Sequence, residues 1–165
     1  MPMIVGLSAD CRALTLGMLL MPALRRLDSA ETMPSMTASA PVVLIVGGDS
    51  RDVETTASAL DRRFGSDYRV LTAGSAADGL AELTGLARSG EQVALVAADL
   101  HLPDGNGVDF LERAAGLHSG VARILLFDLD DYHTRIPFRE LAALQRASAL
   151  GRIDGWMVKG WVNPE

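Results

Sequence analysis

Short apolar runs alternate with amphipathic stretches along the chain after Pro41. Five such runs stand at residues 42–46, 68–72, 93–98, 123–127 and 155–158. Each is short and rich in Val, Leu, Ala or Ile, which is typical of strands buried on both faces of a parallel sheet. Between them, apolar residues recur at helical spacing, which predicts helices over about 50–64, 75–87, 108–117 and 137–150. Ser50 and Asp52 are candidate N-caps of the first helix, and Ser75 is the candidate for the second.

Strands that alternate with helices predict βαβ units, and hence an α/β fold with a doubly wound, five-stranded parallel sheet. Right-handed crossovers place helices on both faces of such a sheet. The sequence ends at Glu165, soon after the fifth strand, so we expect the sheet to lack a fifth helix. The fourth and fifth strands would then show an apolar face, which we expect residues 12–27, a partner or a lost fused domain to cover.

Residues 1–40 differ in character from the predicted domain at 41–165. The stretch at 28–41 is rich in Ser, Thr, Ala, Met and Pro without periodicity, as in a linker. Before it, the sequence predicts either a short helix at 12–20 that Pro22 ends or bends, or residues translated from too early a start codon. Asp10 and Arg12 interrupt the apolar region, so we expect neither a signal peptide nor a membrane span.

Composition excludes several functions. The formal net charge is −6 and no basic run occurs, which argues against a nucleic-acid-binding face. Cys11 is the only cysteine, so neither an internal disulfide nor a cysteine-rich zinc site can form, and a cytoplasmic location fits. Gly47–Gly48 lacks the rest of a dinucleotide-binding fingerprint. No nucleophile–base pair is visible, so we do not expect an enzyme.

Three charged residues follow predicted strands. Asp49 comes just after the first strand, Asp99 ends the third and Lys159 ends the fifth. Ligand sites of open α/β sheets lie at the carboxyl ends of the strands, so these residues would share one crevice. There the ammonium group of Lys159 would favour the ionised form of Asp99.

The segments VVLIVGGDS, VALVAADLHLPDGNGVDFL, RILLF and GWMVKGW resemble the receiver domain of bacterial response regulators. The resemblance covers Pro41 to Glu165 and implies a flavodoxin-like, CheY-like sheet of order 2-1-3-4-5. It implies that Asp99 is the phosphoacceptor and that Lys159 contacts the phosphoryl group. Pro103 and Gly107 would shape the pocket, and a histidine kinase would be the partner.

The segments RRFGSDYRVLTAGSAADGLAEL and WMVKGWVNPE resemble the receiver half of receivers fused to thioredoxin-reductase-like flavoproteins. That likeness implies a second function, a detached regulatory module that contacts a flavin-dependent reductase domain without being phosphorylated.

The chain departs from the receiver pattern at three places. Gly47 and Gly48 stand where the acidic pair is expected, Phe127 where a Thr or Ser is expected, and Gly160 where a Pro is expected. Mg²⁺ prefers several oxygen ligands, so a magnesium site built from Asp99 and Asp49 would be weak.

Two pocket residues have a second interpretation. Asp49 is the alternative N-cap or first-turn acid of the first helix, where the helix dipole favours a negative charge. His101 lies in the pocket loop, either to modulate the site with pH or as a solvated residue. The sequence therefore predicts a degenerate receiver, a pseudo-receiver of two-component signal transduction.

Overall fold

The structure of this chain is a computed structural model that describes residues 39–128 and 138–159. The predicted N-terminal extension lies almost wholly outside the described residues, as do the segment 129–137 and the last six positions, 160–165. The expectations about a helix at 12–20, a linker and an absent fifth helix are therefore not described by the structure.

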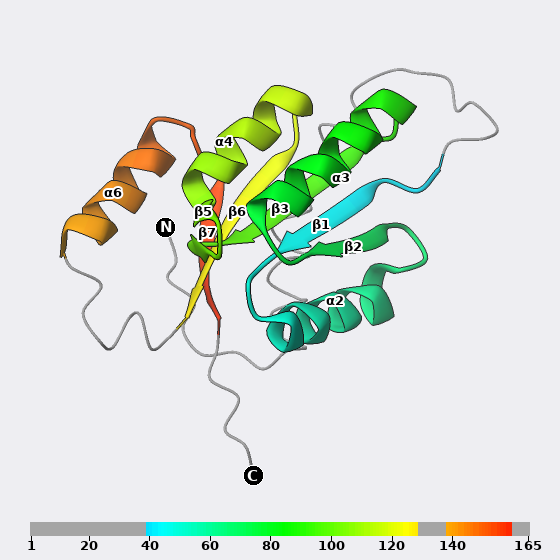
Figure 1. The fold of residues 1–165 in the computed structure, drawn as a ribbon, viewed down its shortest axis with the longest axis horizontal. Coiled ribbons are helices and arrows are strands. Elements are labelled where there is room, and N and C mark those ends of the chain that lie inside the picture. The colour runs from blue at the N-terminus through cyan, green and yellow to red at the C-terminus, as the bar shows by residue number, and fades with distance from the viewer. Residues whose placement is uncertain (1–38, 129–137, 160–165) are drawn as a thin grey trace, which may run out of the picture.

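A parallel sheet of five strands forms the centre of the domain, in the order β2-β1-β3-β6-β7 (Figure 1). The strands are β1 (Val42–Val46), β2 (Arg69–Ala73), β3 (Val93–Asp99), β6 (Ala122–Asp128) and β7 (Gly155–Lys159). A hairpin of two very short strands, β4 (His101–Leu102) and β5 (Gly105–Asn106), follows β3. When this hairpin is set aside, the order in the sheet is the predicted 2-1-3-4-5, and the flavodoxin-like fold is confirmed.

The described residues contain the four helices that the periodicity predicts, each within two residues of its expected bounds. They are α2 (Ser50–Phe64), α3 (Ala76–Ser89), α4 (Gly107–Leu117) and α6 (Phe138–Ala149). None of these helices is long and apolar enough to cross a membrane.

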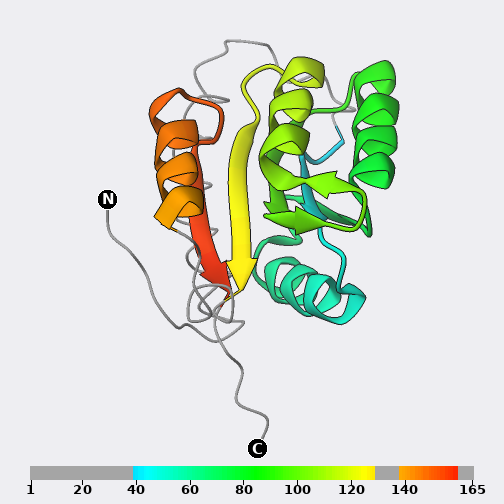
Figure 2. The ribbon, with the colours of Figure 1, turned by 60° about the vertical axis from the view of Figure 1, so that its left-hand side comes forward.

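The helices lie on both faces of the sheet (Figures 1 and 2). Leu83 of α3, Phe110 of α4 and Leu144 of α6 belong to one buried cluster with the sheet. Val53 and Leu60 of α2 belong to a second cluster on the opposite face. The domain is therefore doubly wound, with three described helices on one face and one on the other.

Local capping explains where the helices begin. Ser75 is the N-cap of α3 as predicted, because its Oγ accepts a hydrogen bond from the Asp78 backbone N–H at 3.1 Å. For α2, the expectation of Ser50 or Asp52 as N-cap is wrong, whereas the alternative prediction of Asp49 as N-cap is confirmed. The helix already begins at Ser50, and the Asp49 carboxylate takes the capping role because it stands one residue before the first turn.

Candidate functional site

The carboxyl ends of β1, β3, β6 and β7 meet at one edge of the sheet, because all four strands are parallel. The register pairs Val46 of β1 with Ala98, and Asp99 with Leu126 of β6. On the far side of β6, Asp128 pairs with Lys159. Asp99 and Lys159 therefore end strands that are not adjacent, because β6 lies between them, and their shared crevice stays a prediction.

The Asp99 side chain lies directly over Gly47. A Cβ atom placed on Gly47 would stand 2.5 Å from Oδ2 of Asp99 and 2.7 Å from Cγ2 of Val53. Asp99 is half-buried in this position. Its carboxylate thus fills the space that a side chain at position 47 would need, and only glycine allows so close an approach.

Two further predicted pocket residues adjoin this site. A Cβ atom on Gly107 would overlap the carbonyl oxygen of Asp99, and the Gly107 backbone N–H donates to the Leu100 carbonyl at 2.9 Å. A Cβ atom on Gly48 would stand 3.0 Å from Cγ of Pro103. The structure therefore brings Asp99, Gly107, Pro103 and the two glycines after β1 together.

Asp49 caps the N-terminus of α2 at this edge of the sheet. Its Oδ1 accepts hydrogen bonds from the backbone N–H groups of Arg51 at 3.0 Å and Asp52 at 3.2 Å. Such bonds stabilise the N-terminus of α2 and occupy this carboxylate oxygen. Within residues 39–128 and 138–159, no three His, Cys, Asp or Glu side chains form a group that could hold a metal ion. The described side chains therefore do not form the acidic cluster that the receiver pattern implies for magnesium.

Phe127 and Lys159 are described through their backbone alone. Phe127 pairs with Val158, so the position where the receiver pattern expects a hydroxyl lies close to the end of β6. Asp99 pairs with Leu126 of β6, and Leu126 pairs in turn with Met157 of β7. Lys159, the last residue of β7, follows two residues after Met157. The predicted contact of Lys159 with a phosphoryl group stays a prediction.

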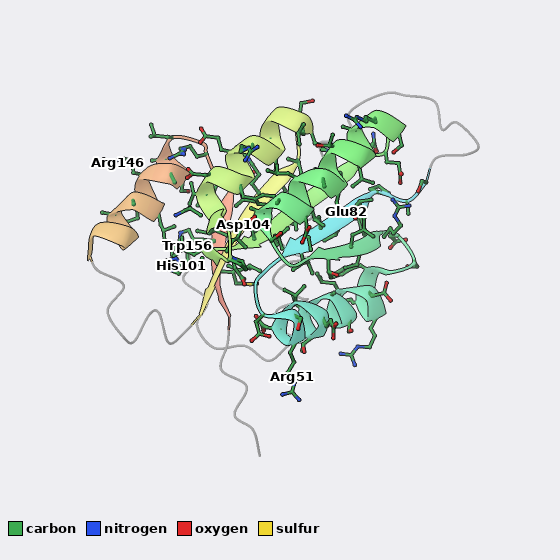
Figure 3. All side chains as sticks on the ribbon, viewed as in Figure 1. Arg51, Glu82, His101, Asp104, Arg146 and Trp156 are labelled. Carbon is green, nitrogen blue, oxygen red and sulfur yellow. The ribbon has the colours of Figure 1, made fainter. Side chains whose placement is uncertain are left out.

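His101 is exposed and adjoins a different cavity from the Asp99 site (Figure 3). This cavity of about 200 Å³ lies between α4 and α6, and its lining includes His101, Val108, Leu144 and Arg152. Arg152 forms ion pairs with Glu112 and Asp109. The hydrogen bond and charge of Glu112, followed by those of Asp109, raise the pKa of Arg152 above its already high ordinary value.

Asp104 is a site residue that sequence reasoning missed. It lies in the turn of the β4–β5 hairpin, and its carboxylate reaches the start of α3 (Figure 3). Oδ2 accepts from the Ala77 backbone N–H at 2.9 Å, and Oδ1 accepts from that of Ala76 at 2.8 Å. These two hydrogen bonds lower the pKa of the exposed Asp104 carboxyl below 3.8. The loop that follows Asp99 is thereby joined to α3.

Replacement of Asp104 by Asn should weaken the start of α3 and change the acid stability of the domain. Because the folded-state pKa is depressed, this carboxylate contributes stability that is present above pH 3.8 and is lost as the pH falls through the folded-state pKa. Thermal melts between neutral pH and about pH 3 should show a shallower acid decline in Asp104→Asn than in the wild type. Glu82→Gln, an exposed change in the middle of α3, is the control and should retain the wild-type slope. Equal slopes for the wild type and Asp104→Asn would refute the role of Asp104.

Comparison with known proteins relates this fold to solved structures. No protein-family model matches the sequence, and the search of curated proteins found no match. Solved structures do match. A CheY-like response regulator receiver domain from Methanospirillum hungatei JF-1 superposes with a TM-score of 0.56 at 26% identity, over 76% of this chain and 86% of that one. The fold is that of CheY-like receiver domains.

Two other solved structures match at lower sequence identity. An adenylate cyclase from Rhodopirellula baltica has a TM-score of 0.55 at 18% identity, over 73% of this chain and 77% of its own. A response regulator from Burkholderia pseudomallei, solved with a phosphorylated aspartic acid, a calcium ion and citrate, has a TM-score of 0.55 at 19% identity. That match covers 74% of this chain and 61% of the other. At these identities the two likenesses show a shared fold alone.

Proposed function

We propose that this chain is a receiver module of two-component signal transduction that acts by protein contact, with Asp99 in a degenerate phosphoacceptor site. The fold and the neighbours in the comparison support the receiver role. The place of Asp99 at the end of β3, beside Gly107 and the β4–β5 hairpin, supports its descent from a phosphoacceptor. The related fold in Burkholderia pseudomallei carries a phosphorylated aspartic acid, which is consistent with that descent.

The main support for a degenerate phosphoacceptor site is the position of the Asp99 carboxylate over Gly47. Phosphoryl transfer depends on positioning and on cations that neutralise the charge of the transferred group. Of the acidic residues that the receiver pattern expects at this site, the chain keeps Asp99. Gly47 and Gly48 stand in place of the acidic pair, and Asp49 caps α2. A phosphoryl group on Asp99 would then depend on Lys159 for compensation, and we expect its formation to be slow.

Incubation of the purified chain with acetyl phosphate and millimolar Mg²⁺, followed by intact mass measurement, tests this proposal. We expect the mass to stay unchanged over a time in which a receiver with both acids is fully modified. In the opposite case, an oxygen of the Asp99 carboxylate attacks phosphorus, the new O–P bond forms, and the bond to the departing acetate breaks. A gain of one phosphoryl group that is lost in Asp99→Asn would overturn the degenerate site and would make Asp99 a working phosphoacceptor.

The expected partner follows from the same proposal. A protein surface is the expected partner, and a histidine kinase is the expected phosphoryl donor only if the acetyl phosphate test is positive. The likeness to an adenylate cyclase shows the fold alone, and we propose no catalytic activity for this chain. The regulatory role beside a flavin-dependent reductase remains a prediction from the sequence, and no observation described above favours it.

A further inference from the structure

Three apolar side chains of β6 and β7 lie on the same face of the sheet as α2. Ile124 and Leu126 of β6 are 1% and 3% exposed, and Met157 of β7 is 6% exposed. All three belong to the buried cluster that contains the core residues of α2. Their strand neighbours Leu125 and Trp156 pack with the cluster on the opposite face, as alternation along a strand requires.

The described helices do not account for this burial. Helix α2 packs on β1 and β2, and an α-helix of about 10–12 Å diameter covers roughly two strands spaced about 4.8 Å apart. In the sheet order, β6 and β7 lie two and three strands away from β1. Helices α3, α4 and α6 pack on the other face (Figure 2). Among the described residues, therefore, no helix covers the part of this face that β6 and β7 form.

Because these side chains are buried within the single chain, their cover must come from residues outside the described ranges. Three segments are available. Residues 160–165 could form less than two helical turns. Residues 129–137 join β6 to α6, which packs on the opposite face, and they are rich in polar side chains. Residues 1–38 contain the one long apolar stretch outside the described domain.

We propose that residues 12–27 pack on the face formed by Ile124, Leu126 and Met157 and complete the core there. A helix would place Leu16 and Leu20, four residues apart, on one side and the equally spaced Leu14 and Met18 on the other, and we assign the Leu16–Leu20 side to the sheet. Residues 28–41 span roughly 45 Å when extended. That length exceeds the roughly 14 Å between β1 and β7, which is three strand spacings. This inference does not rest on the proposed signalling function.

Two substitutions in the full-length chain test the packing. Leu20→Asp would bury a carboxylate against the β6–β7 face, whereas Met18→Asp, in the same turn, would point away from it. We expect Leu20→Asp to lower the Tm by about 5 °C or more and to increase the binding of an apolar dye. Met18→Asp should leave both close to the wild type. Equal effects of the two substitutions would overturn the proposal.

A disulfide trap tests the same contact without a charged side chain. Leu20→Cys with Met157→Cys, in a Cys11→Ser background, should form an intramolecular disulfide on mild oxidation, and Met18→Cys with Met157→Cys should not. A disulfide of equal yield in both pairs, or in neither, would contradict the packing. So would a wild-type dimer whose Tm rises with protein concentration while Leu20→Asp melts like Met18→Asp, because a second copy would then cover the face.

Discussion

Gly107→Ala should be the most destabilising single-methyl change in the described domain, with a loss of about 3 kcal/mol in the free energy of unfolding. The added Cβ would overlap the carbonyl oxygen of Asp99 and would lie 2.9 Å from Cδ1 of Leu125. The first of these is a backbone atom inside the sheet, so relief requires α4 and β3 to move apart. Urea denaturation measures the effect, and at constant m-value the midpoint should fall clearly.

Gly116→Ala is the matched control, because it adds the same methyl group to the same helix. No atom lies within 4 Å of the position that its Cβ would take. Alanine at this exposed helical position should raise the free energy of unfolding by roughly 0.5–1 kcal/mol. If Gly107→Ala were as stable as Gly116→Ala, the close approach of α4 to Asp99 would be incorrect.

Gly47→Asp should lower the free energy of unfolding by about 2 kcal/mol in the absence of divalent cations. Its side chain would meet the Asp99 carboxylate and Val53, and two carboxylates at such a distance repel each other. Millimolar Mg²⁺ should recover part of this loss, because it restores a cation to a site with two acids. The same Mg²⁺ should leave the Tm of the wild type unchanged.

Gly47→Asn separates the steric part of this effect from the electrostatic part. It carries nearly the same bulk without the charge, so it should be less destabilising than Gly47→Asp and should respond little to Mg²⁺. A wild-type chain that Mg²⁺ stabilises as strongly as it stabilises Gly47→Asp would contradict the degenerate site. Thermal melts of the three proteins, with and without Mg²⁺, give the comparison.

The sheet could be predicted from the sequence because its strands are continuous apolar runs between helical segments. A strand such as Val93–Asp99 is buried on both faces until its last residue, so composition alone identifies it. The short β4–β5 hairpin could not be predicted in this way, since two-residue strands carry no periodicity. The N-cap of α2 could not be narrowed to one residue from the sequence because Asp49, Ser50 and Asp52 are all good capping residues, and the structure selects Asp49.

The candidate site was predictable where it depends on strand ends and not where it depends on packing between distant segments. Asp99 and Lys159 are strand-terminal in the sequence and in the structure. The placement of the Asp99 carboxylate over Gly47 joins positions 52 residues apart, and no local pattern reports it. The same holds for the ion pairs of Arg152 with Asp109 and Glu112, which join helix α4 to the turn before β7.

The hydrogen bonds of Asp104 to the start of α3 have a consequence for the order of folding. Ser75 caps this helix from the neighbouring position, so that contact can form as soon as the first turn does. The contacts from Asp104 come from 27 and 28 residues further along the chain and require β3 and its hairpin to be in place. Contacts of larger sequence separation form later because a longer loop must be closed. Asp104 should therefore act mainly on how slowly the finished domain unfolds, and Ser75 on how quickly α3 appears.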